Sequence, residues 1–343
     1  MYKSIRKESG FSLLETIVAV SILSITITIV FFGVSNFVDR SEVQENEKYI
    51  QSLANAFKSH YESYAFEVES NSGASYNLPS QGISINNGAI STSSLESLEA
   101  MSRSVSIPNL RFTDGFNQPF KILISNRLEK EYQGVYIPYR VIAIVSNVDG
   151  DFVNGVPDFD TTMNVNTGEV NINDGELVST FNTYKTQVNK FIETKKKIDK
   201  IANAYTQFYW SRYNQSSGGG IRSRNYFASG GSDWDSGTSI ARTCGSSRQI
   251  EGHNSPGTNI SSTGLSNELN IGVSSYLDEW GQELYMLNCG SVDNVAIGNN
   301  TVRLRPRNPD SPDSNKRTHP YNAIIGMTLS NGQSYIKTLT ARM

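Results

Sequence analysis

The chain of 343 residues is long enough for about two globular domains, and 37% hydrophobic residues can supply their cores. Its formal net charge of −3 argues against binding to nucleic acid through bulk positive charge. It contains only two cysteines, Cys244 and Cys289.

A short basic leader opens the chain, and a long apolar run follows it. The leader, residues 1–10, contains Lys3, Arg6 and Lys7, and no residue between Glu15 and Asp39 is charged. A helix over residues 16–38 would be about 35 Å long at ~1.5 Å per residue, which is enough to cross a bilayer. The sequence therefore predicts a membrane-spanning helix.

Glu15 places a carboxylate at the start of this run, where a charge is costly in a membrane and therefore indicates a function. Residues 10–15 read Gly-Phe-Ser-Leu-Leu-Glu, which resembles the class III signal of type IV pilins and pseudopilins. The resemblance implies that a prepilin peptidase cleaves between Gly10 and Phe11, and that Phe11 is then methylated. It also implies that Glu15 neutralises the N-terminal amine of a neighbouring subunit. A secretory signal fits less well, because its small-residue cleavage site follows the apolar region.

Beyond Asp39 the helix is predicted to continue as an amphipathic rod that buries one face against a sheet. Its apolar side chains recur at mostly three- and four-residue steps: Val43, Ile50, Leu53, Ala54, Phe57, Tyr61 and Tyr64. Residues 113–119 resemble the Asp-Pro-Trp-Gly turn that leads into the sheet of pseudopilins. The apolar runs Phe120–Ser125 and Tyr136–Ser146 are predicted strands.

Four short segments recur in the same order, about 150–185 residues apart, which indicates a tandem duplication. Residues 53–57, 114–122, 138–139 and 146–147 correspond to residues 201–205, 278–286, 320–321 and 330–331. The second copy is predicted to have its own helix, from about Thr180 to Tyr213. That helix carries three consecutive lysines from Lys195 and cannot be a second membrane span.

The predicted fold is therefore α+β, with a long N-terminal helix packed on an antiparallel sheet and a second helix-plus-sheet domain without its own anchor. The expected parts are a leader over residues 1–10, a transmembrane and filament-core helix over 11–38, and pilin-like domains over 39–175 and 176–343. This layout is similar to that of a dual-pilin minor pilin.

The two cysteines have two open interpretations. Because extracytoplasmic compartments are oxidising, we favour a Cys244–Cys289 disulfide. In the chain-entropy model it would add ~3–4 kcal/mol to the free energy of unfolding. A metal site that adds His253 and a fourth ligand is the alternative, although the spacing matches no zinc motif.

An acidic, glycine-containing segment offers alternating oxygen ligands that suit Ca²⁺, which takes six to eight of them. The candidate ligands are Asp149, Asp151, Asn154, Asp158 and Asp160. An acidic loop of Asx turns without a metal is the alternative. The predicted role requires no cofactor.

The function that the resemblance implies is that of a minor type IV pilin, minor because of its size and doubled head, and not that of an enzyme. The expected partners are other pilin subunits, the prepilin peptidase and the pilus assembly machinery. The expected location is the cytoplasmic membrane before assembly, and an extracellular pilus or a periplasm-spanning pseudopilus afterwards. The alternatives are a pseudopilin of a secretion or DNA-uptake machine, and a pilus-borne adhesin. The adhesin would bind a surface or host ligand through the Gly/Ser-rich stretch Ser216–Ser266.

Overall fold

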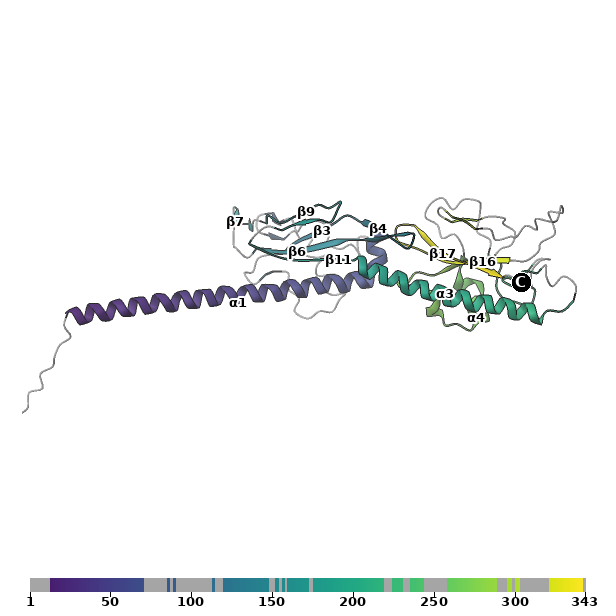
Figure 1. Cartoon of the computed structure of the whole chain (residues 1–343), viewed down its shortest axis with the longest axis horizontal. Coiled ribbons are helices and arrows are strands. Elements are labelled where there is room, and N and C mark those ends of the chain that lie inside the picture. The colour runs from purple at the N-terminus through teal and green to yellow at the C-terminus, as the bar shows by residue number, and fades with distance from the viewer. Residues whose placement is uncertain are drawn as a thin grey trace, which may run out of the picture.

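The computed structural model is elongated, with one long helix leading into two helix-on-sheet layers (Figure 1). It describes residues 13–70, 85–86, 89–90, 113–114, 120–147, 152–153, 156–157, 159–172, 175–218, 224–230, 235–243, 258–288, 295–297, 300–302 and 321–341. The predicted combination of an N-terminal helix with antiparallel sheet is confirmed.

Helix α1 runs over Leu13–Ser70 and bends once, at Tyr64, where the backbone angles are φ −124° and ψ 29°. In its apolar part, four hydroxyls donate to the carbonyl four residues earlier, which satisfies their polar groups inside the helix: Ser21, Ser24, Thr26 and Thr28. The amphipathic stripe predicted downstream is buried at Leu53, Phe57 and Tyr61.

Among the described residues, no helix has a stretch that is both long and apolar enough to cross a membrane.

The first sheet has the strand order β11-β6-β3 and is antiparallel throughout, with β3 at Lys121–Ile124, β6 at Val141–Asn147 and β11 at Glu176–Asn182. Residues Ile142–Val145 of its central strand are fully buried. Ile142 and Ile144 share a core cluster with Phe57 of α1 and Phe120 beside β3. We call α1 from residue 41 onward, together with this sheet, the first unit.

The prediction of a single strand over Tyr136–Ser146 is wrong, because β5 (Val135–Tyr139) ends at Tyr139 and β6 begins at Val141. Strand β5 belongs to a hairpin that it forms with β4 (Leu128–Tyr132). The two-residue turn of this hairpin, Gln133 and Gly134, has positive φ at both positions, as type I′ turns require. Arg140 leaves the ladder because its backbone N–H and C=O bond to Thr183 instead.

The second sheet has the order β12-β13-β16-β17, and helix α3 (Tyr184–Gln215) packs on it. Its strands are β12 (Thr258–Asn259), β13 (Tyr285–Leu287), β16 (Tyr321–Thr328) and β17 (Ser334–Ala341). We call α3 and this sheet the second unit.

The predicted start of the second helix at Thr180 is wrong, because residues 176–182 form β11 and pair along their whole length with β6. Helix α3 begins only after its N-cap residue, Thr183. The predicted domain boundary at residue 176 thus falls on the first residue of a strand that belongs to the first sheet.

The remaining elements are short. They are β1 (Ile85–Asn86), β2 (Ala89–Ile90), β7 (Phe152–Val153), β8 (Val156–Pro157), β9 (Thr162–Met163), β10 (Val170–Asn171), β14 (Val295–Ile297), β15 (Asn300–Val302), η2 (Ile260–Thr263), α4 (Leu265–Leu269) and η3 (Val273–Tyr276). The order β11-β6-β3 of the first sheet corresponds to β17-β16-β13 in the second. This agrees with the tandem duplication, which stays a prediction.

Part of the Gly/Ser-rich stretch that the adhesin alternative would use as its binding surface belongs to the core. Tyr226 and Phe227 are fully buried against α3 residues such as Tyr209. The side chain of Asn288, after β13, holds this segment by accepting from the N–H of Thr243 and donating to the carbonyl of Phe227. Aromatic burial and a satisfied buried amide therefore tie these residues to the second unit.

The turn before β13 is held by hydrogen bonds within the turn and by a lysine of α3. The Asp278 carboxylate accepts hydrogen bonds from the N–H groups of Trp280 and Gln282, while Lys197 Nζ donates to the carbonyl of Leu277. Burial raises the pKa of the Asp278 carboxyl from its ordinary 3.8 to about 6, against the opposing effect of those backbone hydrogen bonds.

We expect Gly326→Ala to destabilise the second unit, because a Cβ there would lie 2.5 Å from Oη and 2.6 Å from Cζ of Tyr285. Overpacking of this kind costs about 1–3 kcal/mol in urea unfolding. Gly272→Ala is the matched control, since its φ is −62° and no atom would lie within 4 Å of the added Cβ. Equal unfolding free energies for the two variants would contradict the close packing at Gly326.

We expect the Asp278 carboxyl to make the free energy of unfolding larger at acidic pH than at neutral pH. Because its folded pKa is raised, the folded state binds more protons between pH 3.8 and about 6. The contribution is therefore complete below the ordinary pKa and is lost as the pH rises through 6, about 3 kcal/mol in all. Asp278→Asn keeps an acceptor oxygen but removes the titration.

The measurement is urea unfolding of both proteins from pH 4 to pH 7. The stability of Asp278→Asn relative to the unsubstituted chain should increase across this range. A difference that does not change with pH would show that the Asp278 carboxyl has an ordinary pKa in the folded state.

Candidate functional site

The processing residues of the N-terminal signal lie partly outside the described residues. Gly10 and Phe11 are outside them, and α1 begins at Leu13. Glu15 lies in the first turn of this helix. Glu15, the residue predicted to act in assembly, is thus the third residue of a helix that is continuous to the bend at Tyr64.

The N-terminal part of α1 extends beyond the first sheet (Figure 1). Its described large side chains have exposed fractions of 48–61%: Ile17, Val18, Val20, Ile22, Leu23, Ile25 and Ile27. At about 100° per residue these positions cover all sides of the helix, so no single face is reserved for the chain's own sheets. An exposed apolar surface of this extent indicates a membrane or protein partner.

A buried polar relay joins the two units where α1 ends. The indole N–H of Trp280 donates to Oε1 of Gln187 at 2.8 Å, and Nε2 of Gln187 donates to the hydroxyl of Tyr61 at 2.6 Å. That hydroxyl donates to Oε1 of Glu69 at 2.6 Å. The relay thus crosses from the turn before β13, through α3, to both sides of the bend in α1.

Arg140 completes this relay with an ion pair, its Nε lying 3.4 Å from Oε2 of Glu69. The Glu69 side chain is fully buried and that of Arg140 is 18% exposed. Burial raises the pKa of the Glu69 carboxyl, and the Arg140 charge opposes this shift. Burial and the neighbouring Glu69 carboxylate raise the pKa of Tyr61 well above its ordinary value, so its hydroxyl stays protonated and able to donate.

No sequence pattern pointed to Glu69, Arg140 or Gln187. Glu69 follows the amphipathic stripe, and Arg140 lies inside what reads as one apolar strand. The only available signal was the charge of Arg140 within that apolar run, which is consistent with a strand break or an exposed position as well as with a buried pair.

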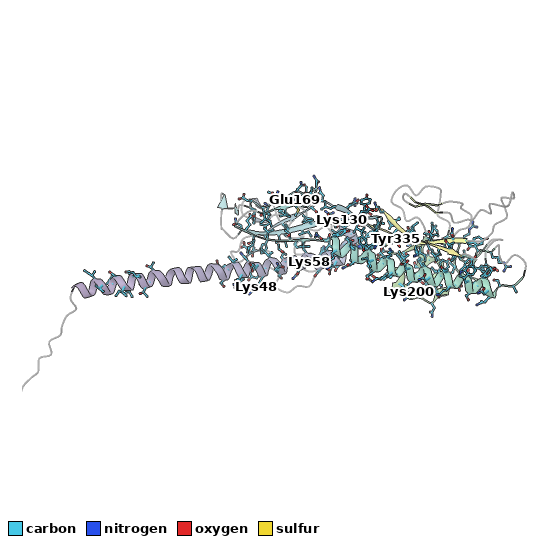
Figure 2. The ribbon with its side chains drawn as sticks, in the orientation of Figure 1. Lys48, Lys58, Lys130, Glu169, Lys200 and Tyr335 are labelled. Carbon is cyan, nitrogen blue, oxygen red and sulfur yellow. The ribbon has the colours of Figure 1, made fainter. Side chains whose placement is uncertain are left out.

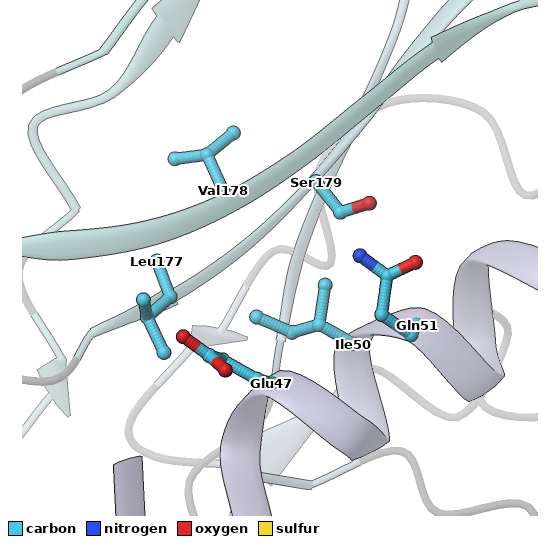
Figure 3. Close-up of a pocket in the computed structure, with 6 residues that line it drawn as sticks. All are labelled: Glu47, Ile50, Gln51, Leu177, Val178 and Ser179. Atoms are coloured by element: carbon cyan, nitrogen blue, oxygen red, sulfur yellow. The ribbon is translucent and has the colours of Figure 1, made fainter. Parts of the chain in front are cut away.

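A cavity of about 240 Å³ lies between α1 and the edge strand β11. Figure 3 shows Glu47 and Leu177 at one end, and Gln51 and Ser179 at the other. The lining combines one carboxylate with an amide, a hydroxyl and apolar side chains, and we assign no reaction to it.

The predicted disulfide and calcium ligands are mostly outside the described residues. Cys244 and Cys289 lie there, as do the candidate calcium ligands Asp149, Asp151, Asn154 and Asp158. Asp160 is described, is exposed, and donates its backbone N–H to Glu176. Within the described part of the chain, no group of three or more His, Cys, Asp or Glu side chains could hold a metal. Both sites stay predictions.

Residues 5–31 match the family model of the prokaryotic N-terminal methylation motif. No curated protein and no solved structure matches the chain. The matched residues contain the leader, Gly10, Phe11, Glu15 and the first part of the apolar helix. The motif implies processing by a prepilin peptidase, a membrane-anchored precursor and assembly with other pilin subunits. The N-terminus is therefore the class III signal peptide of type IV pilins and pseudopilins, which supports a type IV pilin-like or pseudopilin precursor.

Proposed function

We propose that the mature chain is a minor subunit of a type IV pilus, which enters the filament through α1 and carries two folded units outward. The observation that carries the proposal is the match of residues 5–31 to the methylation motif, at the start of a helix whose apolar side chains are uncovered. In this role the precursor is held in the cytoplasmic membrane until the peptidase removes residues 1–10. Methylation of the new N-terminus at Phe11 follows.

Assembly replaces the lipid around the apolar helix with the helices of neighbouring subunits. A bundle of such helices buries the side chains that the isolated chain exposes from Ile17 to Ile27. Glu15 is the one charged residue between the cleavage point and Asp39. In an apolar bundle it needs an opposite charge, and the Phe11 amine of an adjacent subunit supplies one.

The size of the chain favours a minor subunit. The first sheet lies along the C-terminal part of α1, and the second unit lies beyond the end of that helix (Figure 1). A subunit of this shape places its second unit far from the apolar helix. The adhesin and pseudopilin alternatives remain, but burial of Tyr226 and Phe227 removes two aromatic residues from the surface that an adhesin would use.

Mass spectrometry of the N-terminus tests the processing step. Co-expression with a prepilin peptidase should give a chain that begins at Phe11 and carries one added methyl group. Without the peptidase the chain should keep residues 1–10. Cleavage after the apolar run, or an uncut Met1 in the presence of an active peptidase, would contradict the proposal.

Glu15→Ala should reduce incorporation into filaments, because it leaves the neighbouring Phe11 amine without a counter-charge. Removing one partner of a buried ion pair costs roughly 3–5 kcal/mol, which corresponds to a loss of about 100-fold or more. The measurement is the fraction of the chain recovered in sheared filaments. Glu62→Ala is the control, since it removes an exposed carboxylate from the same helix. Equal recovery of the two variants would rule out the role of Glu15.

A further inference from the structure

The β4–β5 hairpin starts and ends in the first unit but packs into the core of the second. Its strands form a separate two-stranded sheet and share no ladder with β3 or β6 among the described residues. Val135 and Ile137 of β5 are 7% and 0% exposed, and both belong to the core cluster of α3 and the second sheet. The hairpin is therefore an arm of one unit that completes the core of the other.

Aromatic contacts extend this packing along α3. The rings of Tyr132 and Phe191 meet edge to face with centroids 6.1 Å apart, and those of Tyr139 and Tyr184 with centroids 5.3 Å apart. Lys130 Nζ lies 5.1 Å from the Tyr184 ring centroid. Edge-to-face pairs of this kind stabilise the packing beyond the apolar area that they bury. Figure 2 shows Lys130 and Tyr335 where the two units meet.

Polar contacts fix the hairpin to the turn between β16 and β17. The backbone N–H of Tyr136 donates to Oε1 of Gln333 at 2.8 Å, and Nδ2 of Asn331 donates to the carbonyl of Tyr136 at 2.9 Å. At the tip, Lys195 Nζ donates to Oε1 of Gln133 at 2.9 Å. The hairpin is thus held on α3 and on the second sheet at once.

Hydrogen bonds and an ion pair hold the base of the hairpin in the first unit. Arg127 and Arg140 flank the hairpin on its two sides, and both contact Glu69: Arg127 donates to its carbonyl at 3.1 Å, and Arg140 pairs with its carboxylate. Arg140 also donates to the carbonyl of Ser125 at 3.1 Å. Trp280, in the turn before β13, packs against both core clusters.

We propose that the β4–β5 hairpin and the buried relay from Glu69 to Trp280 form a junction clamp, which makes the two units a single rigid body. Interfaces between units of one chain are otherwise expected to permit relative motion unless they are large and apolar. The clamp removes that freedom by sharing one hairpin between two cores. The second unit consequently stays at a constant distance and orientation from α1.

The purpose of this rigidity rests on the proposed function. A subunit held in a filament by α1 can place its second unit at a defined position only if the junction between the units does not bend. Tension applied to the second unit would reach α1 through the hairpin and the relay, in addition to the single covalent connection between β11 and α3.

The experiment measures distances between spin labels on the full chain in detergent micelles, before any assembly. A keto-bearing non-natural amino acid at positions 48 and 200 carries the labels, so Cys244 and Cys289 are not modified. Both positions are exposed lysines, one on α1 and one on α3 (Figure 2). The unsubstituted chain should give one narrow distance distribution. Ile137→Ser, which removes an apolar anchor of the hairpin, should broaden it roughly twofold or more.

Tyr136→Ser is the matched control, because this neighbouring side chain is 47% exposed on the opposite face of β5. Its distribution should stay as narrow as that of the unsubstituted chain. Circular dichroism of each variant checks that both units remain folded. A narrow distribution for folded Ile137→Ser, or a broad one for the unsubstituted chain, would overturn the clamp.

A second variant decides the matter if Ile137→Ser does not fold. Gln333→Ala combined with Lys195→Ala removes polar contacts of the hairpin without entering a core. A broadened distribution supports the clamp, and an unchanged one overturns it. Because these measurements need neither cleavage nor assembly, failure of the clamp is distinguishable from failure of the filament proposal, which the N-terminal mass and the Glu15 variant test separately.

Discussion

The buried ion pair between Glu69 and Arg140 is the interaction on which the arrangement of this chain depends. Its carboxylate lies beyond the bend in α1, and its guanidinium lies where β5 ends and β6 begins. The backbone of Arg140 bonds to Thr183, the N-cap residue of α3. One residue thus connects the end of the first helix, the base of the hairpin and the start of the second helix. The buried Glu69 carboxylate and the mostly buried Arg140 guanidinium are paired, and their other polar atoms have hydrogen bonds: Tyr61 donates to Oε1 of Glu69, and Arg140 donates to the carbonyl of Ser125.

In the proposed filament subunit, this junction connects an exposed apolar helix to two folded units. The described large apolar side chains of α1 from Ile17 to Ile27 are exposed, whereas side chains such as Leu53 and Phe57 farther along the helix pack into the core of the first sheet. The helix is therefore suited to bind a membrane or other helices at one end while it supports a folded unit at the other. The hairpin that enters the second core connects the first unit to the second at their junction.

Sequence patterns predicted the elements that depend on local periodicity and missed those that depend on distant partners. The stripe through Leu53 and Phe57 and the apolar runs of β3 and β6 follow from spacing alone. Spacing alone does not predict the division at Arg140, because residues 136–146 are apolar enough to resemble one strand. The division arises because the backbone N–H and C=O of Arg140 bond to Thr183. Likewise, Phe181 fits the helical spacing of α3, but seven residues of pairing with β6 make it part of β11. Tyr226 and Phe227 lie in a Gly/Ser-rich stretch, and only their packing against Tyr209 identifies them as core.

The sequence by itself determined the N-terminal signal, since a basic leader, Gly10, Phe11, Glu15 and a charge-free run are adjacent along the chain and need no fold to be recognised. It also determined that a helix would precede each sheet, because helical periodicity is local. Only the tertiary structure decided that Glu69, Arg140, Gln187 and Trp280 form one relay, and that Val135 and Ile137 fill the core of the other unit. These contacts join residues far apart in sequence, and a buried partner for a charge or a core for a hairpin exists only once the two units have come together.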